Sequence, residues 1–198
     1  MYMFSPSSTP EEINRRVNQL SYPLKNKRSW IPRWRFASLI ARHDRGGTRR
    51  RILGDLAIVG KVSCGGKLCH NSRSLKWVFR DDKQSYLRGF NFNICPENVN
   101  AYGYVTEKIF QSIEAGCIPV YWGAGNDPEP DVLNHDAILY WDDCSDSRQK
   151  LIDRVHALTS NPASLQAFQQ QPRLSEHAGE TVKAYFRDLE DHLRRVLA

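Results

Sequence analysis

The chain has 198 residues, of which 40% are hydrophobic and 25% are charged, and its formal net charge is +6. This balance is typical of a soluble globular domain, and the length fits one domain comfortably and two domains poorly. The sequence has no run of about 18 apolar residues, so we expect no transmembrane helix. It also lacks a basic-then-apolar N-terminus, so we expect no signal peptide.

The N-terminal part, residues 1–30, predicts a polar segment with one short helix at 11–20 rather than a domain. Glu11 and Glu12 directly follow a Thr-Pro pair, where acidic residues are expected for helix capping. A catalytic role for either carboxylate is the weaker alternative. We expect the main domain to comprise residues 31–198.

Residues 25–51 hold ten Lys and Arg side chains and a single acidic residue. Such a cluster attracts anions. Three anionic targets are possible: a pyrophosphate, an anionic membrane surface and nucleic acid. Trp30 and Trp34 could stack on the bases of a nucleic acid. The alternation of basic and apolar residues is instead typical of a strand preceded by a linker.

The segment 46–48, Gly-Gly-Thr, predicts a turn and an N-cap before an amphipathic helix. This prediction places Arg49 in the first helical turn, where the helix dipole disfavours a cation. Such a cation indicates a bound anion nearby.

Residues 92–123 predict a strand, a loop, a helix and a second strand, which is the unit that builds parallel sheets. The first strand covers 92–95, and a polar loop follows at 96–103. A helix then begins near 104–106 with an apolar stripe of period 3.6. Gly116 predicts the end of this helix, and 118–122 reads as a second buried strand.

The start of this helix is unusual. Thr106 is a good N-cap candidate, and Glu107 suits the positive end of the helix dipole. Lys108 does not suit it, because a cation there is disfavoured by a few tenths to ~1 kcal/mol. Its position makes sense if it points at an anion bound at the helix N-terminus; the alternative is an ordinary surface lysine.

Three stretches, taken in order, resemble the signature of glycosyltransferase family 10, the α-1,3/1,4-fucosyltransferases that use GDP-fucose. They are Glu97-Asn98, then 102–108 (YGYVTEK), then 118–123 (IPVYWG). The resemblance covers residues 34 to 145. It implies an α/β fold with a Rossmann-like parallel sheet flanked by helices, the C-terminal donor half of a GT-B enzyme.

The resemblance also implies transfer of fucose from GDP-fucose to a glycan acceptor hydroxyl, with inversion. The general base is expected in an N-terminal acceptor domain, of which residues 1–30 would be at most a remnant, so no catalytic residue is assigned here. We expect no obligatory metal or other cofactor, although a divalent metal could be stimulatory. A second chain could supply the acceptor domain.

The resemblance implies a set of donor-binding residues, some of which have simpler alternatives. Lys108 and Arg49 would bind the diphosphate. Glu107 would accept hydrogen bonds from sugar hydroxyls, or would only interact favourably with the helix dipole. Tyr104 would contact the donor, or would only pack over the helix start. Asn98 would bind the ligand, or would hydrogen-bond the backbone of its own loop. The implied donor-binding residues are Arg49, Glu97, Asn98, Tyr104, Thr106, Glu107 and Lys108.

Two other functions stay open at this point. One is a non-catalytic or truncated GDP-sugar-binding domain. The other, less favoured because it has no motif beyond charge, is a basic module for anions or nucleic acid; we expect no nucleic-acid partner. We expect a cytoplasmic protein, with peripheral membrane contact through the basic segment, or a Golgi-membrane protein if the chain is a fragment of a eukaryotic enzyme.

The remaining features are weaker. Cys64, Cys69 and His70 faintly suggest a metal site, but no second Cys/His pair follows at zinc-binding spacing, so we expect no metal. Beyond the motif, 137–141 predicts a strand. Three helices are expected after it, at 148–158, 163–170 and 175–197, the last with one long apolar face.

Overall fold

The computed structural model describes residues 8–24 and 33–197. Its centre is a five-stranded sheet in the order β2-β1-β3-β4-β5, in which all neighbouring strands are parallel. This confirms the predicted Rossmann-like sheet. The strands are β1 Arg35–Leu39, β2 Val62–Cys64, β3 Phe90–Ile94, β4 Ile118–Tyr121 and β5 Leu139–Tyr140.

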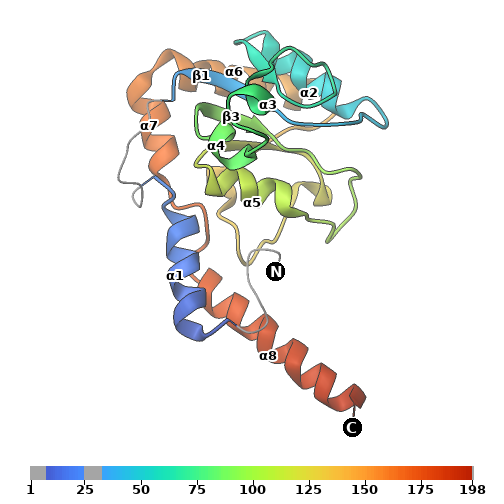
Figure 1. The fold of residues 1–198 in the computed structure, drawn as a ribbon, viewed down its shortest axis with the longest axis vertical. Coiled ribbons are helices and arrows are strands. Elements are labelled where there is room, and N and C mark those ends of the chain that lie inside the picture. The colour runs from blue at the N-terminus through green and yellow to red at the C-terminus, as the bar shows by residue number, and fades with distance from the viewer. Residues whose placement is uncertain (1–7, 25–32, 198) are drawn as a thin grey trace.

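Helices cover both faces of the sheet, with α2 and α6 on one side and α5 on the other (Figure 1). The described helices are α1 Pro10–Ser21, α2 Thr48–Ala57, α3 Ser74–Trp77, α4 Lys83–Leu87, α5 Glu107–Glu114, α6 Ser145–Ser160, α7 Pro162–Gln170 and α8 Ala178–Leu197. Short 3-10 turns lie at Ala124–Asn126 and His135–Ala137. The predicted strands and helices are therefore confirmed, with ends shifted by a few residues.

The core on each face comes from the apolar stripes of these helices. On one face, Ile52 of α2 and Val155 of α6 are fully buried against the sheet. On the other face, Ile109 and Ile113 of α5 are fully buried, as the 3.6-residue stripe predicts. Gly116 ends the α5 segment with φ +77°, a conformation that favours glycine.

Arg33 ties this end of α5 to the sheet. Its guanidinium donates to the Ala115 carbonyl and to the Phe90 carbonyl, each at 2.6 Å. A Cβ on Gly116 would lie 2.5 Å from the Arg33 Nη2 atom. This member of the basic segment therefore has a structural role and is not a free anion-binding cation.

The N-terminal helix α1 packs on the same domain. Thr9 and Glu12 form a capping box, in which each side chain accepts from the other residue's backbone N–H, as predicted. Ile13 and Leu20 are buried in one apolar cluster with residues of α5 and α8. The expected boundary between residues 30 and 31 lies outside the described residues.

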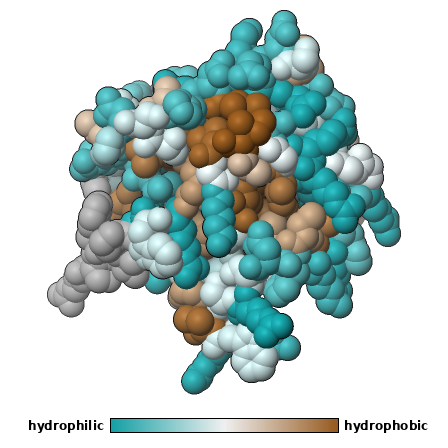
Figure 2. Space-filling model, turned by 90° about the horizontal axis from the view of Figure 1, so that it is seen from above, coloured by the Kyte–Doolittle hydropathy of each residue, from teal (hydrophilic) through white to brown (hydrophobic). Residues whose placement is uncertain are grey.

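The long helix α8 is buried only at its start. Ala178 and Val182 belong to the core, whereas Leu193, Val196 and Leu197 are exposed by 48%, 68% and 83%. The C-terminal part of α8 extends away from the body of the molecule (Figure 1). At the other end, the view from above shows a largely hydrophilic surface around a hydrophobic area (Figure 2). Among the described residues, no helix is long and apolar enough to cross a membrane.

Candidate functional site

The strand order creates a topological switch point between β1 and β3. From β1 the chain continues to β2 on one side, and from β3 it continues to β4 on the other side. Parallel α/β sheets bind ligands beyond the carboxyl ends of the strands at such a switch point. A cavity of about 180 Å³ lies there. Its lining comprises Leu39, Ile40, Ala41, Arg42, His43, Arg49, Ile94, Pro96, Asn98 and Lys108.

Arg49 reaches this cavity from the first turn of α2, where the sequence predicts it. The residue is only 8% exposed. Its Nη2 atom donates to Asn98 Oδ1 at 2.8 Å and more weakly to the Glu97 carbonyl at 3.4 Å, and Nη1 donates to the His43 carbonyl at 3.2 Å. The loops after β1 and β3 therefore hold the guanidinium at the cavity wall.

The N-terminus of α2 differs from the prediction. The N-cap is Gly47, with φ +78° and no side-chain cap bond, and Thr48 is already helical. The Asp44 carboxylate instead accepts from the backbone N–H groups of Arg49, at 2.9 Å, and Arg50, at 3.1 Å. The Gly-Gly turn takes two positive φ angles, which lets the chain bring Asp44 back to the helix. The expected Thr48 cap is wrong, and these two amides already have an anionic partner.

The N-terminus of α5 has another arrangement. Thr106 occupies the N-cap position with extended backbone, as predicted, but its side chain makes no cap bond. Its N–H donates to Glu97 Oε1 at 2.8 Å, and its hydroxyl donates to Glu97 Oε2 at 2.7 Å. A carboxylate is a stronger acceptor than a neutral group, so the hydroxyl turns toward Glu97. Within 8–24 and 33–197, no side chain accepts a hydrogen bond from the first-turn amides of α5.

Lys108 lines the cavity and is held by the same carboxylate. Its Nζ atom donates to Glu97 Oε2 at 2.8 Å and to Thr106 Oγ1 at 3.0 Å. Its side chain is 27% exposed, whereas that of Glu97 is fully buried. Both sequence-based alternatives, an anion-facing lysine and a surface lysine, missed this ion pair, because it crosses a loop that no local pattern describes.

Glu97 is fixed inside the protein. Its backbone N–H donates to the Trp122 carbonyl at 2.8 Å, and its side chain packs against Gly123, where a Cβ would lie 2.8 Å from both Glu97 Cβ and Cγ. Burial, and then the nearby charge of Glu97, raise the pKa of Tyr121, so this hydroxyl stays neutral. The carboxylate thus faces its own chain rather than open solvent.

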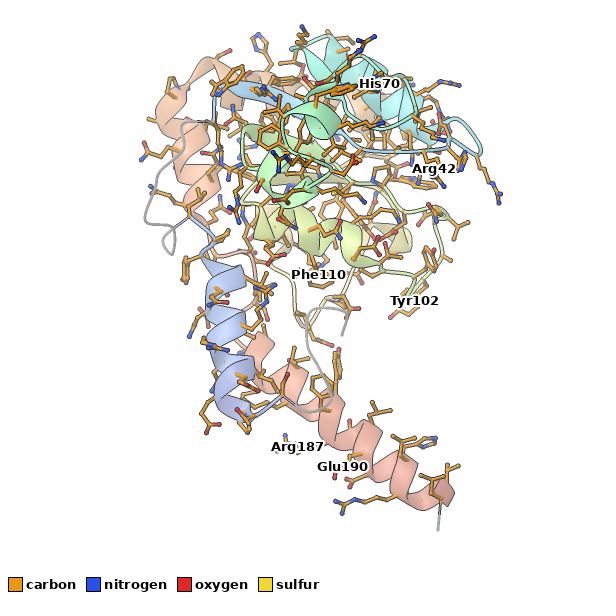
Figure 3. The ribbon with its side chains drawn as sticks, viewed as in Figure 1. Arg42, His70, Tyr102, Phe110, Arg187 and Glu190 are labelled. Carbon is orange, nitrogen blue, oxygen red and sulfur yellow. The ribbon has the colours of Figure 1, made fainter. Side chains whose placement is uncertain are left out.

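The other predicted site residues lie around the cavity in different ways. Asn98 lines it and accepts from Arg49. Tyr104, which is 37% exposed, lies on the loop before α5 and outside the cavity lining. Glu107 lies in the first turn of α5, and its side chain makes no hydrogen bond or ion pair with another residue of 8–24 or 33–197. In Figure 3, Arg42 and Tyr102, from the loops after β1 and β3, lie on the same side of the molecule.

A second, basic hollow adjoins the cavity. It has a volume of about 380 Å³ and shares Arg42 and His43 with the cavity. Its lining comprises Arg42, His43, Asp44, Arg45, Arg50, Lys67, Leu68 and Cys69. No described carboxylate forms an ion pair with its arginine and lysine side chains. Sequence reasoning missed the contribution of Lys67, which follows β2 rather than β1.

Other cations of the 25–51 segment have structural partners. Arg35 lies over the Trp34 ring at 4.3 Å, and Arg51 pairs with Asp143. Lys25, Lys27, Arg28 and Trp30 lie outside the described residues. Among the described residues of this segment, the cations that line the cavity or the hollow are Arg42, Arg45, Arg49 and Arg50.

The Cys64, Cys69 and His70 group serves local structure. Burial raises the pKa of the Cys64 thiol to about 11, and the His70 ring forms a hydrogen bond with the Gly66 carbonyl at 2.9 Å through Nδ1. Within the described ranges, no three His, Cys, Asp or Glu side chains are arranged to hold a metal ion.

Comparison with known families gives one match that covers most of the chain. The family model described as "Glycosyltransferase family 10 (fucosyltransferase) C-term" matches residues 30–183. This range includes all five strands, both walls of the cavity and the basic hollow.

Two curated relatives show the same likeness at the level of sequence. The alpha-(1,3)-fucosyltransferase FucT of Helicobacter pylori is 33% identical over 108 residues, which are 54% of this chain and 20% of the relative. An alpha-(1,4)-fucosyltransferase of Arabidopsis thaliana is 32% identical over 89 residues, 44% of this chain and 21% of the relative. The chain thus spans about a fifth of the length of these relatives.

Solved structures show the same likeness at the level of the fold. A crystal structure of alpha1,3-fucosyltransferase with GDP matches with a TM-score of 0.60 and 23% identity, over 80% of this chain and 48% of that chain. A crystal structure of alpha1,3-fucosyltransferase with GDP-fucose matches with a TM-score of 0.58 and 23% identity. The match covers 89% of this chain and 51% of that chain. The expected fold, one Rossmann-like half of a GT-B architecture, is confirmed.

Proposed function

The chain belongs to glycosyltransferase family 10, and we propose that it binds GDP-fucose in the cavity between β1 and β3 for transfer of fucose to a glycan hydroxyl. One observation carries the proposal: Arg49 and Lys108 come from two different helices and line the same cavity at the switch point of the sheet. The donor named in the matched structure with GDP-fucose carries a diphosphate, which needs such cations.

The two cations suit the chemistry of the leaving group. Negative charge grows on the diphosphate as the bond to fucose breaks, and fixed cations stabilise that charge. The planar fork of Arg49 matches two phosphate oxygens, and Lys108 supplies a compact charge from the other wall. Arg49 is held by Asn98, and Lys108 is held by Glu97, so neither side chain has to be ordered when the donor binds.

The cavity is too small for the whole nucleotide. Pockets for drug-sized ligands hold about 300–1,000 Å³, and this cavity holds about 180 Å³. The adjoining basic hollow of about 380 Å³ shares two lining residues with it. We therefore expect the nucleotide to extend from the cavity across Arg42 and His43 into the hollow.

The remaining site residues have smaller proposed roles. Glu107, whose side chain has no partner among the described residues, would accept from a ribose or fucose hydroxyl. Tyr104, on the adjacent loop, would cover the bound donor. Asn98 and Thr106 would act through Arg49 and Lys108, because their side chains bond to those two residues.

The acceptor and the general base belong to a part beyond these 198 residues in our proposal, in further sequence or in a second chain. The matched structures favour this view, because the chain corresponds to about half of each of them. The second candidate, a GDP-sugar-binding domain without turnover, is favoured by the same observation. A fucose-transfer assay with a supplied acceptor half would separate the two candidates.

Calorimetric titration of the purified chain tests donor binding directly. GDP and GDP-fucose are expected to bind without added metal, and equally well with a chelator, whereas ADP and UDP bind more weakly. A folded chain that binds none of the four nucleotides would contradict the proposal.

A further inference from the structure

We infer that Glu97 is a positioning residue of the donor site, which acts on the diphosphate through Lys108 and through the N-terminus of α5. The inference rests on the proposed function, because it assigns the residue that prepares the proposed diphosphate site. The sequence motif implies that Glu97 contacts the donor directly. The inference gives Glu97 an indirect role instead.

One carboxylate accepts from three donors, one of which is the cavity-lining Lys108. Glu97 Oε1 accepts from the Thr106 N–H at 2.8 Å, while Oε2 accepts from the Thr106 hydroxyl at 2.7 Å and from Lys108 Nζ at 2.8 Å. Both oxygens are therefore used within the protein, and the residue is only 1% exposed. Because the side chain is fully buried, these bonds inside the protein are the contacts that the structure gives to the Glu97 carboxylate.

Lys108 keeps capacity for a ligand in this arrangement. An ammonium group has three N–H donors, and the structure uses one on Glu97 and one on the Thr106 hydroxyl. The third donor remains, on a side chain that lines the cavity. A lysine side chain is flexible, so holding it in place before binding reduces the ordering that binding requires.

The same carboxylate takes the N–H of the N-cap residue Thr106 and leaves the amides of the first turn of α5 open. A threonine at the N-cap ordinarily accepts from an amide of the first turn, but the Thr106 hydroxyl donates to Glu97 and makes no cap bond. The first amides of a helix have no intrahelical partner, and an anion is a favourable partner for them. Glu97 thus directs both the lysine and the uncapped helix end toward one ligand.

Glu97 cannot relax easily from this position. Gly123, at φ +139°, lies against its side chain so closely that a Cβ there would be 2.8 Å from Glu97 Cβ and Cγ. The Glu97 backbone is also bonded to Trp122. Gly123 and Trp122 therefore hold Glu97 in place, and the position of its carboxylate sets the positions of Thr106 and Lys108.

The experiment compares the affinities of GDP and guanosine, measured by calorimetry and by competition, in the wild type, Glu97→Gln, Lys108→Met and the double variant. Glu97→Gln is expected to weaken GDP binding about tenfold, which is about 1.4 kcal/mol, and to leave guanosine binding unchanged. In the double variant, the loss of GDP affinity is expected to be smaller than the product of the two single fold-losses, because part of the effect of Glu97 acts through Lys108.

Asp55→Asn is the matched control. Asp55 is a second buried carboxylate, which accepts from Trp141 Nε1 at 2.7 Å and pairs with Arg148 at 2.6 Å. This change is expected to lower the melting temperature without changing the ratio of GDP to guanosine affinity. Thr106→Val, which retains the buried carboxylate, is the second variant if Glu97→Gln does not fold, and it is expected to weaken GDP binding about threefold.

Three results would overturn the inference. The first is unchanged GDP affinity in a folded Glu97→Gln or Thr106→Val variant, and the second is an equal loss of GDP and guanosine affinity. The third is full additivity of Glu97→Gln with Lys108→Met. A folded wild-type chain that does not bind GDP would overturn the proposed function itself, and the positioning role with it.

Discussion

The N-termini of α2 and α5 look equivalent in sequence and differ in structure. Each carries a cation in its first turn, Arg49 in α2 and Lys108 in α5, and both cations line one cavity. The amides of α2 are already bonded to the Asp44 carboxylate, whereas the end of α5 has no side-chain cap, because Thr106 turns to Glu97. The position of the nearest carboxylate, and not the cation, decides which helix end is available.

Because of this difference, we expect the N-terminus of α2 to contribute to stability and the N-terminus of α5 to contribute to binding. A side-chain cap such as Asp44 stabilises a helix by about 0.5–2 kcal/mol, so the end of α2 contributes to folding and fixes Arg49. The end of α5 gives up that contribution, and its amides stay available to an anion. We expect mutations at the two ends to have different effects on stability and on binding.

Gly123→Ala should displace the Glu97 side chain, and with it the bonds that Glu97 makes to Thr106 and Lys108. The new methyl group would meet Glu97 Cβ and Cγ at 2.8 Å in a backbone conformation of φ +139°. Strain and overpacking together should lower the free energy of unfolding by about 3 kcal/mol. Urea unfolding measures this loss, and Gly179→Ala, within α8, is the control. A change below about 1 kcal/mol would show that the chain relaxes around the methyl group.

Lys108→Ala and Arg49→Ala should each weaken GDP binding by about 1.5–3 kcal/mol, or about 10- to 100-fold. Lys108→Ala should also lower the stability, because it leaves the buried Glu97 without its ion-pair partner. Calorimetry and thermal melting measure the two effects, with Lys150→Ala as the control for charge. Unchanged affinity in both variants would contradict the assignment of the diphosphate site.

Asp44→Ala should affect stability but not binding. Removal of the carboxylate leaves the Arg49 and Arg50 amides without their acceptor, and the expected loss is about 1 kcal/mol. GDP affinity should stay equal or rise slightly, because one negative charge leaves the surroundings of the cavity. Thermal melting and calorimetry on the same variant test both statements. A large loss of GDP affinity would mean that Asp44 positions Arg49 for the ligand, as Glu97 does for Lys108.

The smallest expected effect is the pH dependence that comes from Asp55. Burial raises the pKa of this carboxyl group, but hydrogen bonds from Arg148 and Trp141 outweigh burial and lower it below its usual value. A lowered pKa in the folded state gives stability that is present above the unfolded pKa of about 3.9 and is lost as the pH falls through the folded value.

Chemical unfolding from pH 6 to pH 3 should therefore show a steeper loss of stability in the wild type than in Asp55→Asn. The difference should be below about 1 kcal/mol, because Arg148 is partly exposed to solvent. If the free energies of unfolding of the two proteins fall in parallel with pH, Asp55 does not contribute to the acid sensitivity of the fold.

Local patterns predicted the elements of this fold and missed the contacts between them. The stripe of α5, its end at Gly116 and the two flanking strands follow from residue spacing. The first-turn positions of Arg49 and Lys108 also follow from spacing. These features depend on neighbours within about four residues, which a single sequence displays directly.

The site needed information that spacing does not contain. Glu97 reaches Lys108 across a loop, and Asp44 replaces Thr48 as the cap through a glycine turn. In both cases several acceptors compete for one donor, and the path of a loop decides among them. Lys67 joined the basic hollow for the same reason, since it follows a strand next to β1 rather than β1 itself.

The contact between Gly123 and Glu97 has a consequence for how this sequence can change over time. The side chain at 97 occupies the space that any side chain at 123 would need. A larger residue at 123 would need this space and would also be strained at φ +139°. A smaller residue at 97 would relieve only the first of these two costs and would no longer hold Lys108. A variant library that randomises both positions should therefore recover glycine and glutamate as a pair.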